Sequence, residues 1–231
     1  SPMRVIFLPS AFKTGNARSN AEISPPTIIE SVAFCAPVTP PDTGASRKSM
    51  PRDSASAGIP LGDLGRQMVR AGVIDRDKFL ALYRGRPELR EEARQLLDSD
   101  SAKTEITSEN AGLVLNFFWA LGLANMNPIL EMEMMDPRYG GAGNFASTGG
   151  WTLARGDTMS HYNMHEFGSL TAEEQTQVDK VSRTIFRPCC GNSAHFPDCN
   201  HGMAMLAYLE LLASQGAGEK EMTQKANELN A

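Results

Sequence analysis

The segment from Glu109 to Leu123 constrains the fold more than any other part of the chain. Its apolar residues lie on nearly every side of a helix, and Thr107 or Ser108 can cap its first turn. A helix that is apolar all round must be surrounded by other elements, because no side of it is suited to water. The apolar stretch is shorter than the roughly 20 residues that cross a bilayer. We therefore expect it to be the central helix of a helical domain, with no transmembrane segment in this chain.

Most of the chain after residue 58 carries the periodicity of helices that bury one side. Apolar residues recur at spacings of three and four, with glycine or proline at the expected ends. These signals predict further helices over residues 61–71, 76–84, 88–97, 172–187, 202–214 and 219–229, and a helical turn over 128–135. We expect the last helix to be polar and frayed. Thr171 and Glu174 have the spacing of a capping box, and no alternating strand pattern occurs.

The predicted fold is accordingly mainly α. We expect a single, irregular domain of about seven helices over residues 59–231, with a Cys/His loop between its last long helices. Residues 1–58 differ from this domain, because they are rich in Pro, Ser, Thr and Ala, which is typical of an extended or partly disordered arm. Such an arm is a candidate docking segment for a protein partner. It also resembles a tether, so we expect an extracytoplasmic bacterial protein from which an upstream leader or anchor has been removed.

The charge balance bears on the partners of the chain. Its net charge is −5 and its sequence pI is about 5.4. Proteins that bind nucleic acid usually present a basic surface to the phosphates. We therefore expect no nucleic-acid partner.

The chemistry of the chain is concentrated between positions 189 and 201. Three of the four cysteines lie there, together with two of the four histidines. Thiolate and imidazole groups are the ligands of zinc, copper and iron–sulfur centres. The sequence therefore predicts a metal-binding protein, either a carrier, a sensor or a metalloenzyme, with zinc or copper favoured over an iron–sulfur cluster or haem. The candidate ligands are Cys189, Cys190, Cys199, His201 and His195.

The spacing of these cysteines leaves alternatives open. Cys189 and Cys190 are adjacent, and adjacent side chains tend to diverge, so a tetrahedral set would use one of them with Cys199, His201 and His195 or another residue. A disulfide from this pair to Cys199 would instead staple a helical interaction module without catalysis. Thiol redox chemistry is a third reading, because Cys199 directly precedes a predicted helix, where a thiolate is stabilised.

A second histidine pair lies upstream of the cysteines. His161 and His165 are one helical turn apart, so a helix would place both imidazoles on one side, where they could complete the metal site or bind a second ion. The glutamate of a zinc-protease motif does not follow His161. The alternative interpretation is that both histidines lie on the surface and bind no metal.

The glycine-rich segment from Gly140 to Gly150 is a second feature without regular periodicity. It lacks the Gly-Lys-Ser/Thr ending of a phosphate-binding loop and follows no predicted strand, so nucleotide binding is not indicated. We expect this segment to form a lid or a close-packed crossing, with Trp151 nearby to line a pocket.

Overall fold

The computed structural model describes residues 58–132, 134, 136–188 and 190–230. Within them the chain forms seven α-helices and one short two-stranded antiparallel sheet. The helices are α1 (Leu64–Ala71), α2 (Arg76–Ala81), α3 (Pro87–Asp98), α4 (Ala111–Ala124), α5 (Ala172–Ser182), α6 (Asn200–Ser214) and α7 (Glu219–Asn230). The strands are β1 (Ile59–Gly62) and β2 (Ala102–Thr104). The mainly helical fold predicted from the sequence is confirmed, whereas the predicted arm lies outside the described residues except at residue 58.

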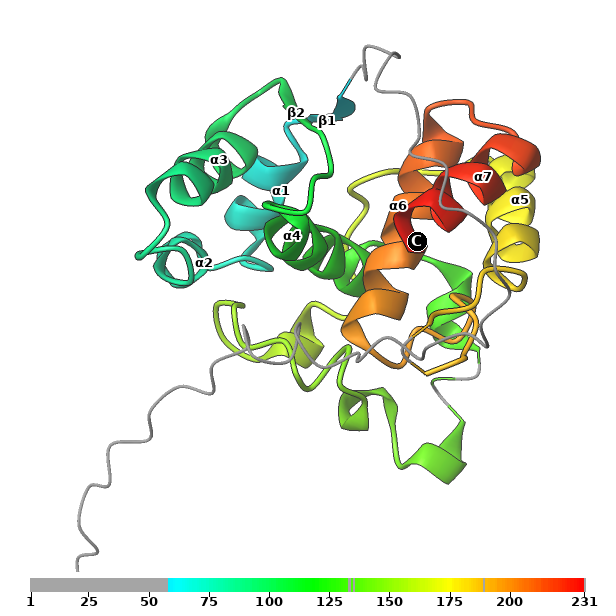
Figure 1. Cartoon of the computed structure of the whole chain (residues 1–231). Helices are drawn as coiled ribbons and strands as arrows, with labels where there is room; N and C mark the ends of the chain where they lie inside the picture. The colour runs from blue at the N-terminus through cyan, green and yellow to red at the C-terminus, as the bar shows by residue number, and fades with distance from the viewer. Residues whose placement is uncertain (1–57, 133, 135, 189, 231) are drawn as a thin grey trace, which may run out of the picture.

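Helices α4 and α6 cross at the centre of the molecule. Figure 1 shows α1, α2 and α3 on the side of α4, and α5 and α7 on the side of α6. The crossing is close because Gly122 has no side chain: a Cβ there would lie 2.2 Å from the backbone oxygen of Met203. α4 is therefore the central helix that its apolar composition predicts. Within the part of the chain that the structure describes, no helix has both the length and the hydropathy needed to cross a membrane.

Helix starts follow the local sequence. Thr171 caps α5 by accepting from the backbone N–H of Glu174, and the Glu174 carboxylate accepts from the N–H of Thr171 in return. This is the predicted capping box. α4 begins later than predicted, after Asn110, because Asn110 and Thr107 bond to each other's backbone N–H groups and form a turn ahead of the helix.

Two predictions about helix packing need correction. α5 ends at Ser182 and not at residue 187 as predicted, and the apolar side chain of Phe186 beyond it is 61% exposed. α7 was expected to be polar and frayed, but it buries Met222 and Ala226 completely and packs against α5 and α6. Two buried side chains one turn apart are sufficient to hold a short polar helix in place.

The glycine-rich segment packs against the centre of the fold. The indole N–H of Trp119 in α4 donates to the Ser147 carbonyl at 2.6 Å, and that of Trp151 donates to the Val73 carbonyl at 2.9 Å. The two indole rings also meet edge to face, with centroids 5.0 Å apart. The segment therefore forms the close-packed crossing rather than an open lid, with short 3-10 turns η4 (Pro137–Tyr139) and η5 (Ala142–Asn144) along it.

Candidate metal centre

One buried arginine organises the loop between α5 and α6. The Arg187 side chain is 1% exposed. Its guanidinium donates hydrogen bonds of 2.8–3.3 Å to three backbone carbonyls of the loop, those of Asn192, Ser193 and Phe196. It also donates to Asp198 Oδ1 at 2.7 Å and to Cys199 Sγ at 2.8 Å. Because the five N–H donors of a guanidinium lie in one rigid plane, this side chain fixes both the path of the loop and two of its functional groups.

A glycine in the first turn of α6 makes room for this guanidinium. A Cβ at Gly202 would lie 2.3 Å from Arg187 Nη1 and 3.0 Å from the Cα of Pro197. The opposite edge of the loop is held by backbone pairing, in which the N–H of Ala194 donates to the Ile185 carbonyl at 2.8 Å. The loop is consequently packed on both sides, although it has no regular structure of its own.

Two cysteines and one aspartate meet at the start of α6. The ligand atoms of Cys190, Asp198 and Cys199 all lie within 4.8 Å of one another. Cys199 is the N-cap residue of α6 in an extended conformation. Cys190 is exposed, whereas Asp198 and Cys199 are partly buried. We refer to Cys190, Asp198 and Cys199 as the three-ligand group.

The pKa of Arg187 depends on the three-ligand group. Burial acts to lower the pKa of Arg187, but the negative charge of Cys199 and the hydrogen bond and charge of Asp198 outweigh it, so the pKa lies above its ordinary value. Asp198 is further held by Asn192, whose side-chain amide donates to Asp198 Oδ2 at 3.0 Å. The guanidinium therefore stays charged and supplies a fixed positive charge beside the ligand atoms of Asp198 and Cys199.

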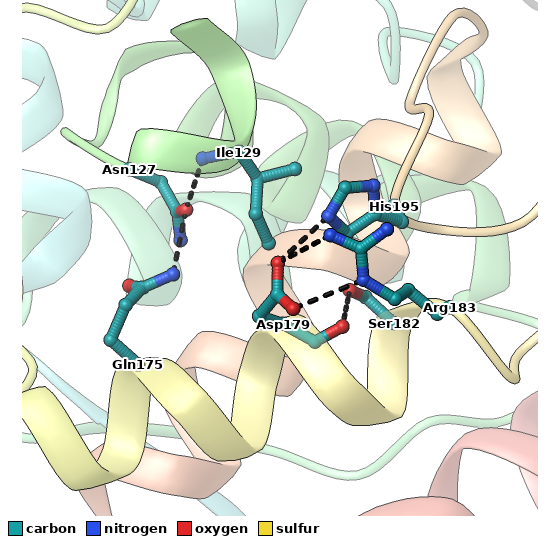
Figure 2. Close-up of polar contacts among 7 residues, drawn as sticks. All are labelled: Asn127, Ile129, Gln175, Asp179, Ser182, Arg183 and His195. Atoms are coloured by element: carbon teal, nitrogen blue, oxygen red, sulfur yellow. Dashed lines mark hydrogen bonds and ion pairs between the residues drawn. The ribbon is translucent and has the colours of Figure 1, made fainter. Parts of the chain in front are cut away.

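His195, one of the ligands predicted from the sequence, has a partner of its own. Its Nε2 lies 2.9 Å from Asp179 Oδ1, and Arg183 contacts the same carboxylate with two N–H groups at 3.0 Å (Figure 2). The hydrogen bond from Arg183 is the main reason why the pKa of Asp179 lies below its ordinary value. The structure thus ties His195 to α5 and does not bring it into the three-ligand group.

His201, a second predicted ligand, lies in the first turn of α6 and lines an apolar cavity rather than the three-ligand group. Burial and, after it, the positive charge of Arg187 lower the pKa of His201. The imidazole is therefore neutral at neutral pH. Cys189, the remaining member of the predicted set, lies outside the described residues.

His161 and His165 meet, although not on one helix. The 3-10 turn η6 (Thr158–Ser160) ends just before His161, and Asn163 has a φ of 56°, which breaks any helix between the two histidines. Their facing ring nitrogens, Nδ1 of His161 and Nε2 of His165, are 3.1 Å apart. Burial and then the charge of His161 lower the pKa of His165. Among the described residues, these imidazoles join no set of three ligand atoms, and ligation by them stays a prediction.

The structure adds Asp198 and Arg187 to the residues expected from the sequence. Both belong to the Cys/His segment, but a carboxylate beside a thiol is common on surfaces, and a buried arginine cannot be recognised without its partners. The adjacency of Asp198 and Cys199, with Gly202 one turn later, is the only signal in the sequence that points to them.

A second buried polar network lies farther along α6. The Glu210 carboxylate is 4% exposed and accepts from the side-chain amides of Asn125 at 2.9 Å and Asn127 at 2.5 Å. The amide oxygen of Asn127 in turn accepts from Gln175 at 3.0 Å (Figure 2). Burial raises the pKa of Glu210 to about 7, and the two asparagine bonds oppose this shift. This network could not be predicted from the sequence, because Glu210 is the single carboxylate in a strongly apolar helix and its partners are distant along the chain.

Comparison with known proteins gives no relative from which a function could be transferred. The chain matches no protein-family model, no curated protein and no solved structure. The function must therefore be argued from the three-ligand group and its surroundings.

Proposed function

We propose that the protein binds a metal ion through Cys190, Asp198 and Cys199, and that zinc is the ion that fits this site best. The observation that carries the proposal is the convergence of two thiols and one carboxylate within 4.8 Å at the start of α6. Zinc takes both cysteine sulfur and aspartate oxygen as ligands. Copper(I) prefers sulfur alone, and iron–sulfur clusters are held mostly by four cysteines, so both fit this mixed set less well.

Charge balance supports the same assignment. Two thiolates and one carboxylate bring three negative charges, and a divalent ion neutralises two of them. The third is balanced by Arg187, which donates to Cys199 Sγ and Asp198 Oδ1. Hydrogen bonds donated to ligand atoms leave other lone pairs for the ion, and such outer contacts orient ligands in known metal sites.

Only a small movement is needed to bind an ion. Zinc–sulfur bonds of about 2.3 Å place two sulfurs of a tetrahedral site roughly 3.8 Å apart, so ligand atoms within 4.8 Å need to close by about 1 Å at most. Three protein ligands leave a fourth position for water or an exogenous group. Because Cys190 is exposed, we propose an exchangeable ion, which suits a carrier or sensor better than a closed structural site.

Zinc content after dialysis tests this assignment. The full chain is loaded with zinc, dialysed and analysed for bound metal per molecule, alongside Cys190→Ser, Cys199→Ser and Cys189→Ser. The proposal expects one zinc in the parent protein and in Cys189→Ser, which is a matched control with the same change at the adjacent cysteine. It expects no stoichiometric zinc in the other two variants. Retention of zinc by Cys199→Ser would refute the proposed ligand set.

A dithiol redox site is the second candidate function. It is favoured by one observation, the proximity of the Cys190 and Cys199 sulfurs, which lie within 4.8 Å of each other. Oxidised glutathione would take two electrons from Cys190 and Cys199, form their disulfide, and leave as two reduced glutathione molecules, with the two thiol protons transferred to them. Mapping of disulfides after this treatment, with and without zinc, distinguishes the candidates: the metal proposal expects zinc to protect both thiols.

A further inference from the structure

An apolar cavity lies beside the start of α6, between α4, α6 and the end of α7. Its volume is about 220 Å³. Its walls are almost entirely apolar, and the main apolar side chains are those of Ile106, Val114, Leu115, Phe118, Met205 and Leu229. A cavity with apolar walls and few polar groups is the usual form of a small-molecule site.

One polar ring, that of His201, belongs to the wall of the cavity. His201 lines it, and among the described residues neither ring nitrogen of His201 makes a hydrogen bond, whereas its backbone N–H donates to Asn200 Oδ1 at 2.9 Å. The other polar residue of the wall, Asn230, is already engaged, because its amide donates to the Phe186 carbonyl at 3.2 Å. A ring nitrogen of an imidazole can donate or accept a hydrogen bond, depending on its tautomer. The ring nitrogens of His201 are therefore the groups available to orient a ligand.

We propose that this cavity binds a small aromatic molecule that carries one hydroxyl group, with the ring against the apolar walls and the hydroxyl bonded to His201. Size sets the class of ligand: an engineered cavity of about 150 Å³ lined by apolar side chains binds benzene. A volume of about 220 Å³ therefore accommodates one substituted ring. This site is separate from the three-ligand group, and it does not depend on metal binding.

The cavity lies close to the candidate metal centre. His201 is two residues from Cys199 on the same helix, and the charge of Arg187 reaches it. A ligand bonded to His201 would therefore lie within one helical turn of the three-ligand group. Arg187 itself contacts the three-ligand group, because it donates to Cys199 Sγ and Asp198 Oδ1.

The test uses 4-fluorophenol as the probe and the full chain with ¹³C-labelled methionine methyl groups. Saturable binding is followed by ¹⁹F NMR, and its location by the methyl resonances. Met205 lines the cavity, whereas Met68 is buried in α1 and serves as an internal reference. The proposal expects the Met205 resonance to shift on saturation while that of Met68 stays in place.

Two variants and a matched control locate the probe. Ala111 and Ala172 are each the exposed first residue of a helix, but only Ala111 lines the cavity. Ala111→Leu is expected to weaken binding about tenfold or more, and Ala172→Leu to leave it unchanged. His201→Phe keeps a ring at this position and is expected to abolish the preference for 4-fluorophenol over fluorobenzene.

Three outcomes would overturn the proposal. They are absence of saturable binding to the full chain, binding that does not shift Met205, and equal weakening by Ala111→Leu and Ala172→Leu. A folded Ala111→Leu protein, checked by its unchanged circular dichroism, makes the last comparison decisive. Retained preference for the hydroxyl in His201→Phe would refute the role of the imidazole.

Discussion

Replacing Glu210 by glutamine should change how the stability of the protein depends on pH. The carboxyl group is buried, and burial raises its pKa from 4.5 to about 7 in the folded protein. Between these two values the folded chain holds a proton that the unfolded chain has released. The unfolded state therefore binds fewer protons, and the free energy of unfolding falls as pH rises. The stabilising effect of the neutral group is complete below pH 4.5 and is lost as pH rises through about 7.

The size of this effect follows from the difference in pKa. One pKa unit corresponds to about 1.4 kcal/mol, so the interval from 4.5 to about 7 amounts to roughly 3 kcal/mol. Glutamine has nearly the same size and does not titrate. Its amide group faces the amide donors of Asn125 and Asn127, whose oxygens are held by other donors. The resulting loss of stability does not depend on pH. It therefore adds a constant to the difference in unfolding free energy between the two proteins and does not affect how that difference changes with pH.

Urea denaturation of both proteins from pH 4 to pH 8, followed by circular dichroism, measures this dependence. The free energy of unfolding of the parent, minus that of Glu210→Gln, should fall by about 3 kcal/mol over this range. Glu166→Gln, at an exposed position, is the matched control and should give a nearly constant difference. A constant difference for Glu210→Gln, or one that increases with pH, would refute the reasoning. An increase would mean that the asparagine amides favour the carboxylate more than burial disfavours it.

Three further substitutions test the packing that supports the site. Gly202→Ala should displace the Arg187 guanidinium and cost about 1–3 kcal/mol in urea denaturation, together with weaker zinc binding, whereas Gly218→Ala, which meets no atom within 4 Å, should do neither. Equal effects of the two changes would contradict this. Gly122→Ala should separate α4 from α6 and destabilise the protein by a similar amount, while Gly112→Ala in the same helix meets no atom within 4 Å and should be neutral or slightly stabilising. A neutral Gly122→Ala would show that the helices do not approach as closely as described. Thr171→Ala should remove one partner of the capping box and lower the free energy of unfolding by about 1 kcal/mol; an unchanged unfolding midpoint would contradict a stabilising cap.

The helical framework could be predicted from the sequence because it depends on local signals. α4 and α6 are apolar on nearly all sides, and Thr171 and Glu174 form a pattern that acts over a single turn. Signals of this kind need no knowledge of distant residues. The end of α5 could not be predicted in the same way, because the apolar residues Ile185 and Phe186 continue its periodicity although the helix stops at Ser182.

The candidate site was only partly predictable, because its members are selected by long-range contacts. Composition indicated the thiols, and two of them do converge with a carboxylate. Asp198, and not His195, lies beside the two thiols because Arg187 holds Asp198 and because Asp179 is bonded to His195. Neither partner can be identified from spacing. The meeting of His161 and His165 likewise depends on a turn at Asn163 rather than on a helix.

X-ray absorption at the zinc edge tests the central claim most directly, because it reports the atoms bound to the ion. The zinc-loaded full chain should show two sulfur neighbours at about 2.3 Å, with lighter oxygen or nitrogen neighbours at about 2.0–2.2 Å completing the shell. One sulfur should remain in Cys199→Ser if that variant is loaded with excess zinc. A first shell without sulfur, or one composed of nitrogen from several imidazoles, would contradict binding through Cys190, Asp198 and Cys199.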